Sequence, residues 1–176
     1  MKGIIPDTKP KLLPPLDPEF CPAVLANRYF LRSVRASGKS VSAAIALERS
    51  DGLISTYRTE VYAQGSGHEE ESCFYMDRLV KALLWVRGGW KVIIGGPGYI
   101  GEYIRDAYKK GGSREFDAVF MGRVYEKPFT VVITEADRIP LPKEGATPVG
   151  RHLDGCRIGF DAGSRITRCW LRRSGM

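Results

Sequence analysis

The 176-residue sequence has no apolar run of the roughly 18 residues that a membrane-spanning helix needs. Its four cysteines form no Cys-x-x-Cys pair, which argues against a zinc site or a disulfide framework and predicts reduced, mostly buried thiols. The two histidines, His68 and His152, have no neighbours suited to metal or nucleophilic chemistry and are expected in exposed loops. These absences favour a cytoplasmic protein with no membrane partner.

Positive charge is plentiful, with a net charge of +7, but it is unevenly distributed. Four arginines and no acid lie within residues 164–176, so the rest of the chain carries an ordinary surface balance. No helix-turn-helix or alternation of aromatic and basic residues accompanies this charge. The sequence therefore predicts a solvated basic face and no nucleic-acid partner.

Two proline-bearing segments divide the chain. Residues 1–22 hold six of the eleven prolines and are expected to form an extended lead-in. Residues 138–155 are interpreted as a linker between domains. Residues 23–137 between them have the length of one α/β domain, with α+β as the alternative, and residues 156–176 form a short last segment.

Strands dominate the expected secondary structure of residues 23–137. Residues 41–48 and 54–62 flank Ser50-Asp51-Gly52, and Asp-Gly between two such runs predicts a β-hairpin. Further strands are expected over residues 23–35, 90–94, 116–125 and 129–133.

Two helices are expected within the same region. Residues 69–87 carry apolar side chains at three- and four-residue steps and end at Gly88-Gly89. A second helix is expected from Pro97, its first residue, to residue 110. Trp85 and Trp90 lie near the junctions of these elements and are expected to cover the core.

Gly96-Pro97-Gly98-Tyr99-Ile100-Gly101 matches the Gly-x-Gly-x-x-Gly fingerprint and lies between an expected strand and an expected helix. A dinucleotide site also needs an acid at the end of the next strand. Asp117 follows Gly98 by a suitable spacing but precedes an apolar run instead of following it. The turn therefore has two interpretations: a tight structural turn, or an anion- or nucleotide-binding turn at Gly96, Gly98 and Gly101.

A second glycine-containing loop lies near the end of the chain. An apolar run leads into Asp161, which is followed by Ala162-Gly163 and the hydroxyl of Ser164. Glycine lets a backbone approach an anion closely, and successive amides can surround it. This order resembles the first phosphate loop of actin-like sugar kinases, Asp-x-Gly-x-x-Thr/Ser.

Residues 151–163 resemble the start of the kinase-like domain of ROK-family proteins, most of all a subgroup with a long N-terminal extension. Residues 45–49, 95–104 and 124–129 resemble that extension. The resemblance implies a mixed-sheet accessory domain followed by the first strand and phosphate loop of an actin-like ATPase domain. It further implies Mg-ATP as cofactor and a sugar as substrate. Asp161 would face the magnesium through water, with Gly163 and Ser164 against the terminal phosphates.

The sequence departs from that family after the loop. The family has a second glycine and then Ser-Asp-x-Lys-Val, where this chain has Ser164 to Arg168. The second phosphate loop, the adenosine loop, the Asn-Asp pair and the Cys-rich zinc motif have no counterpart. Phosphoryl transfer needs metal, phosphate clamps and a positioned nucleophile together. The chain alone is therefore expected to lack kinase activity, and the strand 157–160 is expected to lack its sheet neighbours.

One set of codons for residues 168–176, read one frame over, gives Lys-Val-Leu-Ala-Ala-Ala-Val-Gly-Asp, which fits a second strand. We therefore expect residues from about Ser164 onward to be frameshifted in a truncated kinase-like protein, with a genuine basic tail as the alternative. The nucleotide sequence decides between them. Two other functions stay open: a stand-alone ligand- or partner-binding module, and a small Rossmann-type nucleotide binder that uses Gly96–Gly101.

Overall fold

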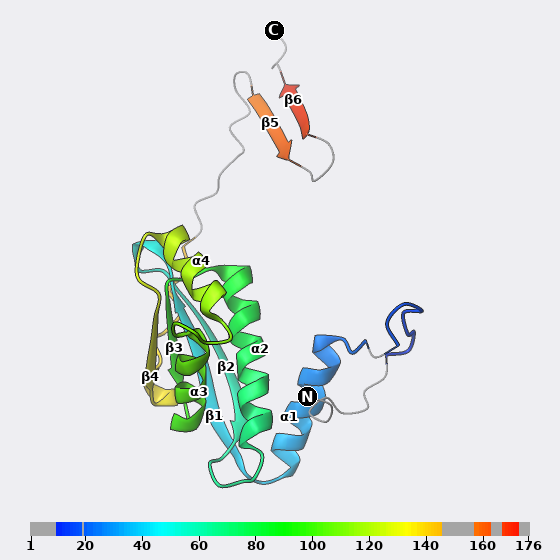
Figure 1. Cartoon of the computed structure of the whole chain (residues 1–176), viewed down its shortest axis with the longest axis vertical. Coiled ribbons are helices and arrows are strands. Elements are labelled where there is room, and N and C mark those ends of the chain that lie inside the picture. Colours follow the sequence, from blue (N-terminus) through cyan, green and yellow to red (C-terminus); the bar gives the residue numbers. More distant parts are fainter. Residues whose placement is uncertain (1–9, 19, 146–156, 163–166, 173–176) are drawn as a thin grey trace. The chain divides into compact units, whose positions relative to one another are not determined.

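The computed structural model describes residues 10–18, 20–145, 157–162 and 167–172. The chain divides into two compact units, residues 1–144 and 145–176. The first unit contains a four-stranded sheet with helices, and the second contains a two-stranded hairpin (Figure 1). None of the described helices combines the length and apolar character needed to cross a membrane.

The sheet of the first unit is mixed, with the strand order β2-β1-β3-β4. Strand β1 (Ser40–Glu48) pairs antiparallel with both β2 (Ile54–Tyr62) and β3 (Lys91–Gly95), whereas β3 pairs parallel with β4 (Thr130–Thr134). The predicted β1–β2 hairpin is confirmed, and its turn is a short 3-10 helix, η1 (Ser50–Gly52). Together with the helices this confirms the α/β class.

The two predicted helices are also confirmed. Helix α2 spans Glu69–Arg87, and Gly88 caps it with a φ of 76°, a value that favours glycine. Helix α3 spans Gly98–Tyr108 and begins one residue later than predicted, because Pro97 is its N-cap. The 3-10 helix η2 (Ala136–Arg138) follows β4.

Residues 23–35, predicted as a strand, form helix α1 (Ala23–Ala36) instead. Its inward residues recur at four-residue steps: Ala26 and Val34 are buried, and Phe30 packs against the core between them. The Phe30 ring stacks on the Tyr75 ring of α2 at a centroid distance of 4.2 Å. The segment forms a helix because its inward residues are spaced at helical intervals; the number of apolar residues alone does not distinguish a helix from a strand.

Residues 116–125, also predicted as a strand, form helix α4 (Glu115–Tyr125). Ala118 and Met121 are buried at a three-residue step. Apolar residues also occupy exposed positions of the same helix, so the sequence does not show the alternation of apolar and polar residues that marks a helix. These exposed residues are Phe116, Val119, Phe120 and Val124.

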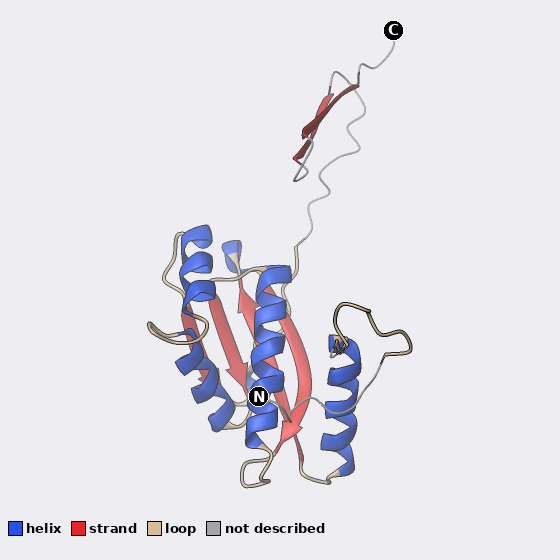
Figure 2. Ribbon diagram, turned by 45° about the vertical axis from the view of Figure 1, so that its right-hand side comes forward, coloured by secondary structure: helices blue, strands red, loops and turns tan. Residues whose placement is uncertain are grey.

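The main core lies between one face of the sheet and the helices (Figure 2). Ile45, Leu47 and Ile94 of the sheet are fully buried there, against α2 residues that include Met76 and Leu84. A smaller apolar cluster lies on the opposite face of the sheet. It consists of Ala44, Ala46 and Ile139, with Ile54 and Ile93 packed against them.

The chain after η2 returns to the sheet before the first unit ends. Ile139 is 4% exposed, and the backbone of Lys143 exchanges two hydrogen bonds of 2.9 Å with that of Ile54. The segment 139–144 therefore lies along β2 as part of the first unit.

The second unit contains strand β5 (Arg157–Ala162), paired antiparallel with β6 (Thr167–Arg172). The predicted strand 157–160 is thus confirmed, but the expectation that it lacks a neighbour is wrong. Residues of the basic tail supply that neighbour, with Asp161 opposite Arg168 in the register.

Candidate functional site

The turn from β3 to α3 is the glycine fingerprint, and two of its three glycines are needed for packing. Gly96 has a φ of 133°, and a Cβ there would lie 3.1 Å from the Ser42 carbonyl oxygen. A Cβ on Gly101 would lie 2.6 Å from Cγ2 of Ile133, so glycine lets α3 pack closely on β4. At these two positions the structural interpretation of the fingerprint holds.

Gly98 differs from its two neighbours. A Cβ added to it would meet no atom within 4 Å, and the residue is exposed. It is the first residue of α3, whose first turn carries no acidic side chain. Because the first amides of a helix have no partner within the helix, they and the helix dipole favour an anion at this end. The anion-binding interpretation therefore concerns Gly98.

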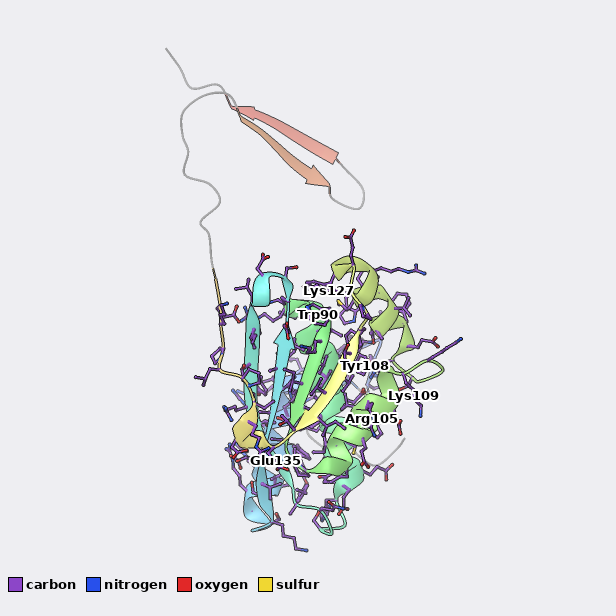
Figure 3. All side chains as sticks on the ribbon, turned by 90° about the vertical axis from the view of Figure 1, so that its left-hand side faces the viewer. Trp90, Arg105, Tyr108, Lys109, Lys127 and Glu135 are labelled. Atoms are coloured by element: carbon purple, nitrogen blue, oxygen red, sulfur yellow. The ribbon has the colours of Figure 1, made fainter. Side chains whose placement is uncertain are left out.

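Parallel pairing brings a carboxylate to this turn that sequence reasoning missed. Gly95 is opposite Thr134 in the β3–β4 register, and the Gly96 amide donates to the Thr134 carbonyl oxygen at 3.2 Å. Glu135 follows directly, exposed at the same end of the sheet (Figure 3). An acid at the end of the strand after the glycine turn is the position that binds a ribose in dinucleotide sites.

Asp117, the acid with the suitable sequence spacing, lies elsewhere. It belongs to α4, is 4% exposed, and accepts a hydrogen bond of 2.8 Å from Nε1 of Trp85. The signal that would have found Glu135 is its place directly after a β-branched run, Thr130–Thr134. Only the β3–β4 pairing shows that the two strand ends meet.

The surroundings of the turn limit what it can bind. A doubly wound fold opens a crevice where helices on opposite faces of the sheet diverge. Here α2, α3 and α4 all contribute to the same core on one face. On the other face Ile139 fills the space beside Gly95, where a Cβ would lie 2.5 Å from its Cγ1. The geometry suits a contact with an anion at the exposed end of α3 better than a buried dinucleotide.

The predicted phosphate loop is described only in part. The backbone of Asp161 lies near the end of β5, and the chain returns antiparallel as β6. Gly163 and Ser164 lie outside the described residues.

The remaining titratable groups indicate structural roles. His68 is exposed, and its Nδ1 lies 3.0 Å from Oε1 of Glu71, whereas His152 lies outside the described residues. Burial raises the pKa of the Cys73 thiol to about 11, which keeps it protonated and unreactive at neutral pH. Within the described ranges, no group of three or more His, Cys, Asp and Glu residues could hold a metal ion.

The two tryptophans predicted to cover the core differ. Trp90 lies at the opposite end of the sheet from Glu135 (Figure 3), where the Nζ atoms of Lys91 and Lys127 approach its ring to 4.7 and 4.6 Å. Trp85 is 45% exposed, so the expectation that it covers the core is wrong for this residue.

Comparison of the chain with protein-family models, with curated proteins and with solved structures gives no significant match.

Proposed function

We propose that the chain is the N-terminal part of a ROK-like, ATP-dependent sugar kinase homologue. The first unit is its accessory domain, and the β5–β6 hairpin is the start of its actin-like ATPase domain. The observation that supports the proposal is the position of Asp161 near the end of β5, which pairs antiparallel with β6. The resemblance places the first phosphate loop in the connection between them.

The chemistry follows from the resemblance. In the family, a phosphoryl group moves from Mg-ATP to a sugar hydroxyl. By this resemblance Asp161 would hold the magnesium through water, and Gly163 and Ser164 would contact the terminal phosphates. A transfer reaction also needs further phosphate clamps and a positioned nucleophile, for which the sequence has no matching motif. The proposed role of this chain is therefore binding without turnover.

A cytoplasmic location belongs to the same proposal. The scattered cysteines, without a Cys-x-x-Cys pair, suit a reducing compartment, and Mg-ATP is the ligand that the phosphate loop would meet there.

The test measures binding and turnover separately on the full chain. We expect Mg-ATP to bind weakly and Asp161→Asn to weaken binding about tenfold through loss of the metal contact. Asp154→Asn, which alters a carboxylate earlier in the same resembling segment, should leave binding unchanged. A coupled assay with hexoses should detect no phosphorylation. Equal binding by both variants would remove the phosphate loop from the proposal, and turnover would contradict the role without catalysis.

A second candidate is a stand-alone binding module whose contact is the Gly96–Gly101 turn. The open space at Gly98 favours it, in a turn whose Gly96 amide bonds to Thr134, the residue before Glu135. Nucleotides are the ligands to test first, with NAD as the probe for the Rossmann-type alternative. Gly98→Val should keep the fold, since a side chain there meets nothing, and should abolish nucleotide binding. Equal NAD binding by the variant and the parent chain would exclude the turn as the site.

A further inference from the structure

A pocket of about 370 Å³ lies on the helical side of the first unit, away from the glycine turn. Helix α1 contributes Ala23 and Asn27, α2 contributes Arg78, Lys81 and Trp85 among others, and Arg114 precedes α4. Its volume lies within the roughly 300–1,000 Å³ of small-molecule sites. Two helices and the N-cap residue of a third thus surround a space lined by three cationic side chains and one indole.

The indole of Trp85 is held in one orientation. Its Nε1 donates a hydrogen bond of 2.8 Å to Oδ1 of Asp117, a carboxylate that is 4% exposed. The ring also stacks on Phe120 of α4, at a centroid distance of 5.1 Å and an interplanar angle of 19°. Turning the indole away would leave a buried carboxylate without this partner, which is costly. Trp85 therefore offers a fixed aromatic surface while remaining 45% exposed.

A second buried carboxylate fixes Arg114 in the same way. Asp77 is 7% exposed and accepts hydrogen bonds from Nε of Arg114 at 3.0 Å and from its Nη2. Hydrogen bonding to Asp77 raises the pKa of the Arg114 guanidinium further above its ordinary value. The positive charge of Arg114 is thus balanced by Asp77, and its planar group is oriented at the pocket wall.

The other two cations of the pocket are not balanced. Among the described residues Arg78 and Lys81 form no ion pair, and no carboxylate lines the pocket. The guanidinium carbon of Arg78 lies 5.4 Å from the centroid of the Phe74 ring, which orients it. The first residue of α1, Ala23, adds the positive end of a helix dipole. The lining therefore attracts an anion.

We propose that this pocket binds a small molecule in which an anionic group, a phosphate or a carboxylate, is joined to a flat aromatic ring. The ring stacks on Trp85, and the anionic group contacts Arg78 and Lys81. Asp117 holds the Trp85 indole that would stack on the ring, and the Phe74 ring orients the Arg78 guanidinium that would contact the anionic group. The inference goes beyond the proposed function and does not rest on it.

The experiment is equilibrium binding to the full chain by calorimetry at low ionic strength. AMP and phenylacetate serve as phosphate and carboxylate probes, and adenosine and ribose 5-phosphate carry the ring or the charge alone. We expect AMP or phenylacetate to bind at least tenfold more tightly than either half of AMP, because stacking and charge act together. Absence of binding by both probes overturns the proposal. Ribose 5-phosphate that binds as tightly as AMP also overturns it, since Trp85 then takes no part.

Lys81→Glu tests the location of the site. Lys81 is exposed and joined to no ion pair of the described chain, so the variant should fold and lose at least tenfold in affinity. Lys39→Glu makes the same charge change beyond the far end of α1 and should retain binding. Equal losses in the two variants would mean a general charge effect and would overturn the assignment to this pocket. Arg78→Gln should weaken binding as well, without reversing a charge.

Discussion

The two faces of the four-stranded sheet are made from alternate residues of the same strands, yet they are packed by different means. On the helical face, Ile45, Leu47 and Ile94 meet the large side chains of α2 and α3 in one continuous core. On the opposite face the strands present Ala44, Ala46 and Gly95. The small residues at these three positions indicate that the covering segment approaches the sheet closely there, with the larger Ile54 and Ile93 beside them.

The opposite face is covered by the chain itself. A Cβ on Gly95 would lie 3.0 Å from Cα of Ala136, which leaves no room for side chains between this segment and the sheet. Hydrogen bonds from β2 hold the segment: Thr56 Oγ1 donates to the Pro140 carbonyl oxygen at 2.9 Å, and Arg58 Nη1 to that of Ala136 at 3.0 Å. Side-chain volume stabilises one face, and hydrogen bonds around one apolar residue, Ile139, stabilise the other.

The largest expected change in stability comes from truncating two neighbouring residues of β3, one on each face of the sheet. Ile94 is 1% exposed in the helical core, whereas its neighbour Ile93 is half-buried on the opposite face. Ile94→Ala should lower the free energy of unfolding by about 3 kcal/mol through lost transfer energy and a cavity. Ile93→Ala should cost about 1 kcal/mol. The half-buried side chain loses less buried apolar surface when it is shortened, and no closed cavity forms. Equal costs in urea denaturation would contradict the distinction between the faces.

Ile139 tests whether one side chain holds the opposite face. Ile139→Ala should cost about 2 kcal/mol and should speed hydrogen exchange at the Ile54 and Lys143 amides, each of which donates to the carbonyl oxygen of the other residue. Leu141→Ala is the control, since that side chain is 79% exposed and should change stability by less than about 0.5 kcal/mol. An unchanged exchange rate at both amides in the Ile139 variant would show that the segment is held by its hydrogen bonds alone.

Tyr108 provides a test of a buried polar group in the core on the helical face. Its hydroxyl is buried without a hydrogen-bond partner in the described chain, so Tyr108→Phe should be neutral or stabilising by up to about 1 kcal/mol. Burial also raises the pKa of the Tyr108 phenol in the folded state. A raised folded pKa contributes stability that is fully present below the unfolded value of 10 and is lost as the pH rises above it.

The dependence of stability on pH above neutrality should therefore differ between Tyr108→Phe and the parent chain. Thermal unfolding between pH 9 and 11 should show a smaller loss for Tyr108→Phe than for the parent chain. Tyr29→Phe, which alters an exposed ring, should follow the parent. A destabilised Tyr108→Phe would mean that the hydroxyl makes a contact in solution.

The smallest effect concerns pH at the opposite face. Hydrogen bonds from Ser55 and Arg49 lower the pKa of Glu144 below 4.5. A lowered folded pKa contributes stability that is present above the unfolded value and is lost as the pH falls through the folded one. Acidification below pH 4 should therefore speed exchange at Lys143 before global unfolding. Glu144→Gln should show the faster exchange already at pH 6, and Glu102→Gln, on the exposed side of α3, should not.

Local patterns predicted those elements whose apolar spacing and turn chemistry agree. The Asp-Gly turn, the three glutamates in the first turn of α2 and the glycines around β3 each act within a few residues, so the hairpin, α2 and α3 were predictable. Helices α1 and α4 were not. Their sequences carry apolar residues on several sides, and only packing selects Val34 and Met121 for the core while Phe116 stays exposed.

The candidate sites show the same division. The Gly96–Gly101 turn was predictable with its strand and helix, because its glycines respond to local backbone demands. Glu135 was not assigned to it, since the β3–β4 pairing joins residues such as Gly95 and Thr134 that lie far apart in the sequence. The pocket at Trp85 was beyond sequence reasoning altogether. Its lining comes from α1, α2 and the N-cap residue of α4, and the carboxylates behind it, Asp77 and Asp117, resemble surface residues of helices in the sequence.

By itself, then, the sequence determined the α/β class, the β1–β2 hairpin, the two regular helices and the strand that carries Asp161. Hydrophobic period and turn residues express short-range geometry, which holds in any fold that contains them. The tertiary structure decided the identity of α1 and α4, the partner strand of β5, the β3–β4 pairing that joins Gly96 to Thr134 next to Glu135, and the orientation of Trp85 and Arg114. Those features depend on which surfaces are buried together, and burial is settled by the whole packed chain rather than by any single segment.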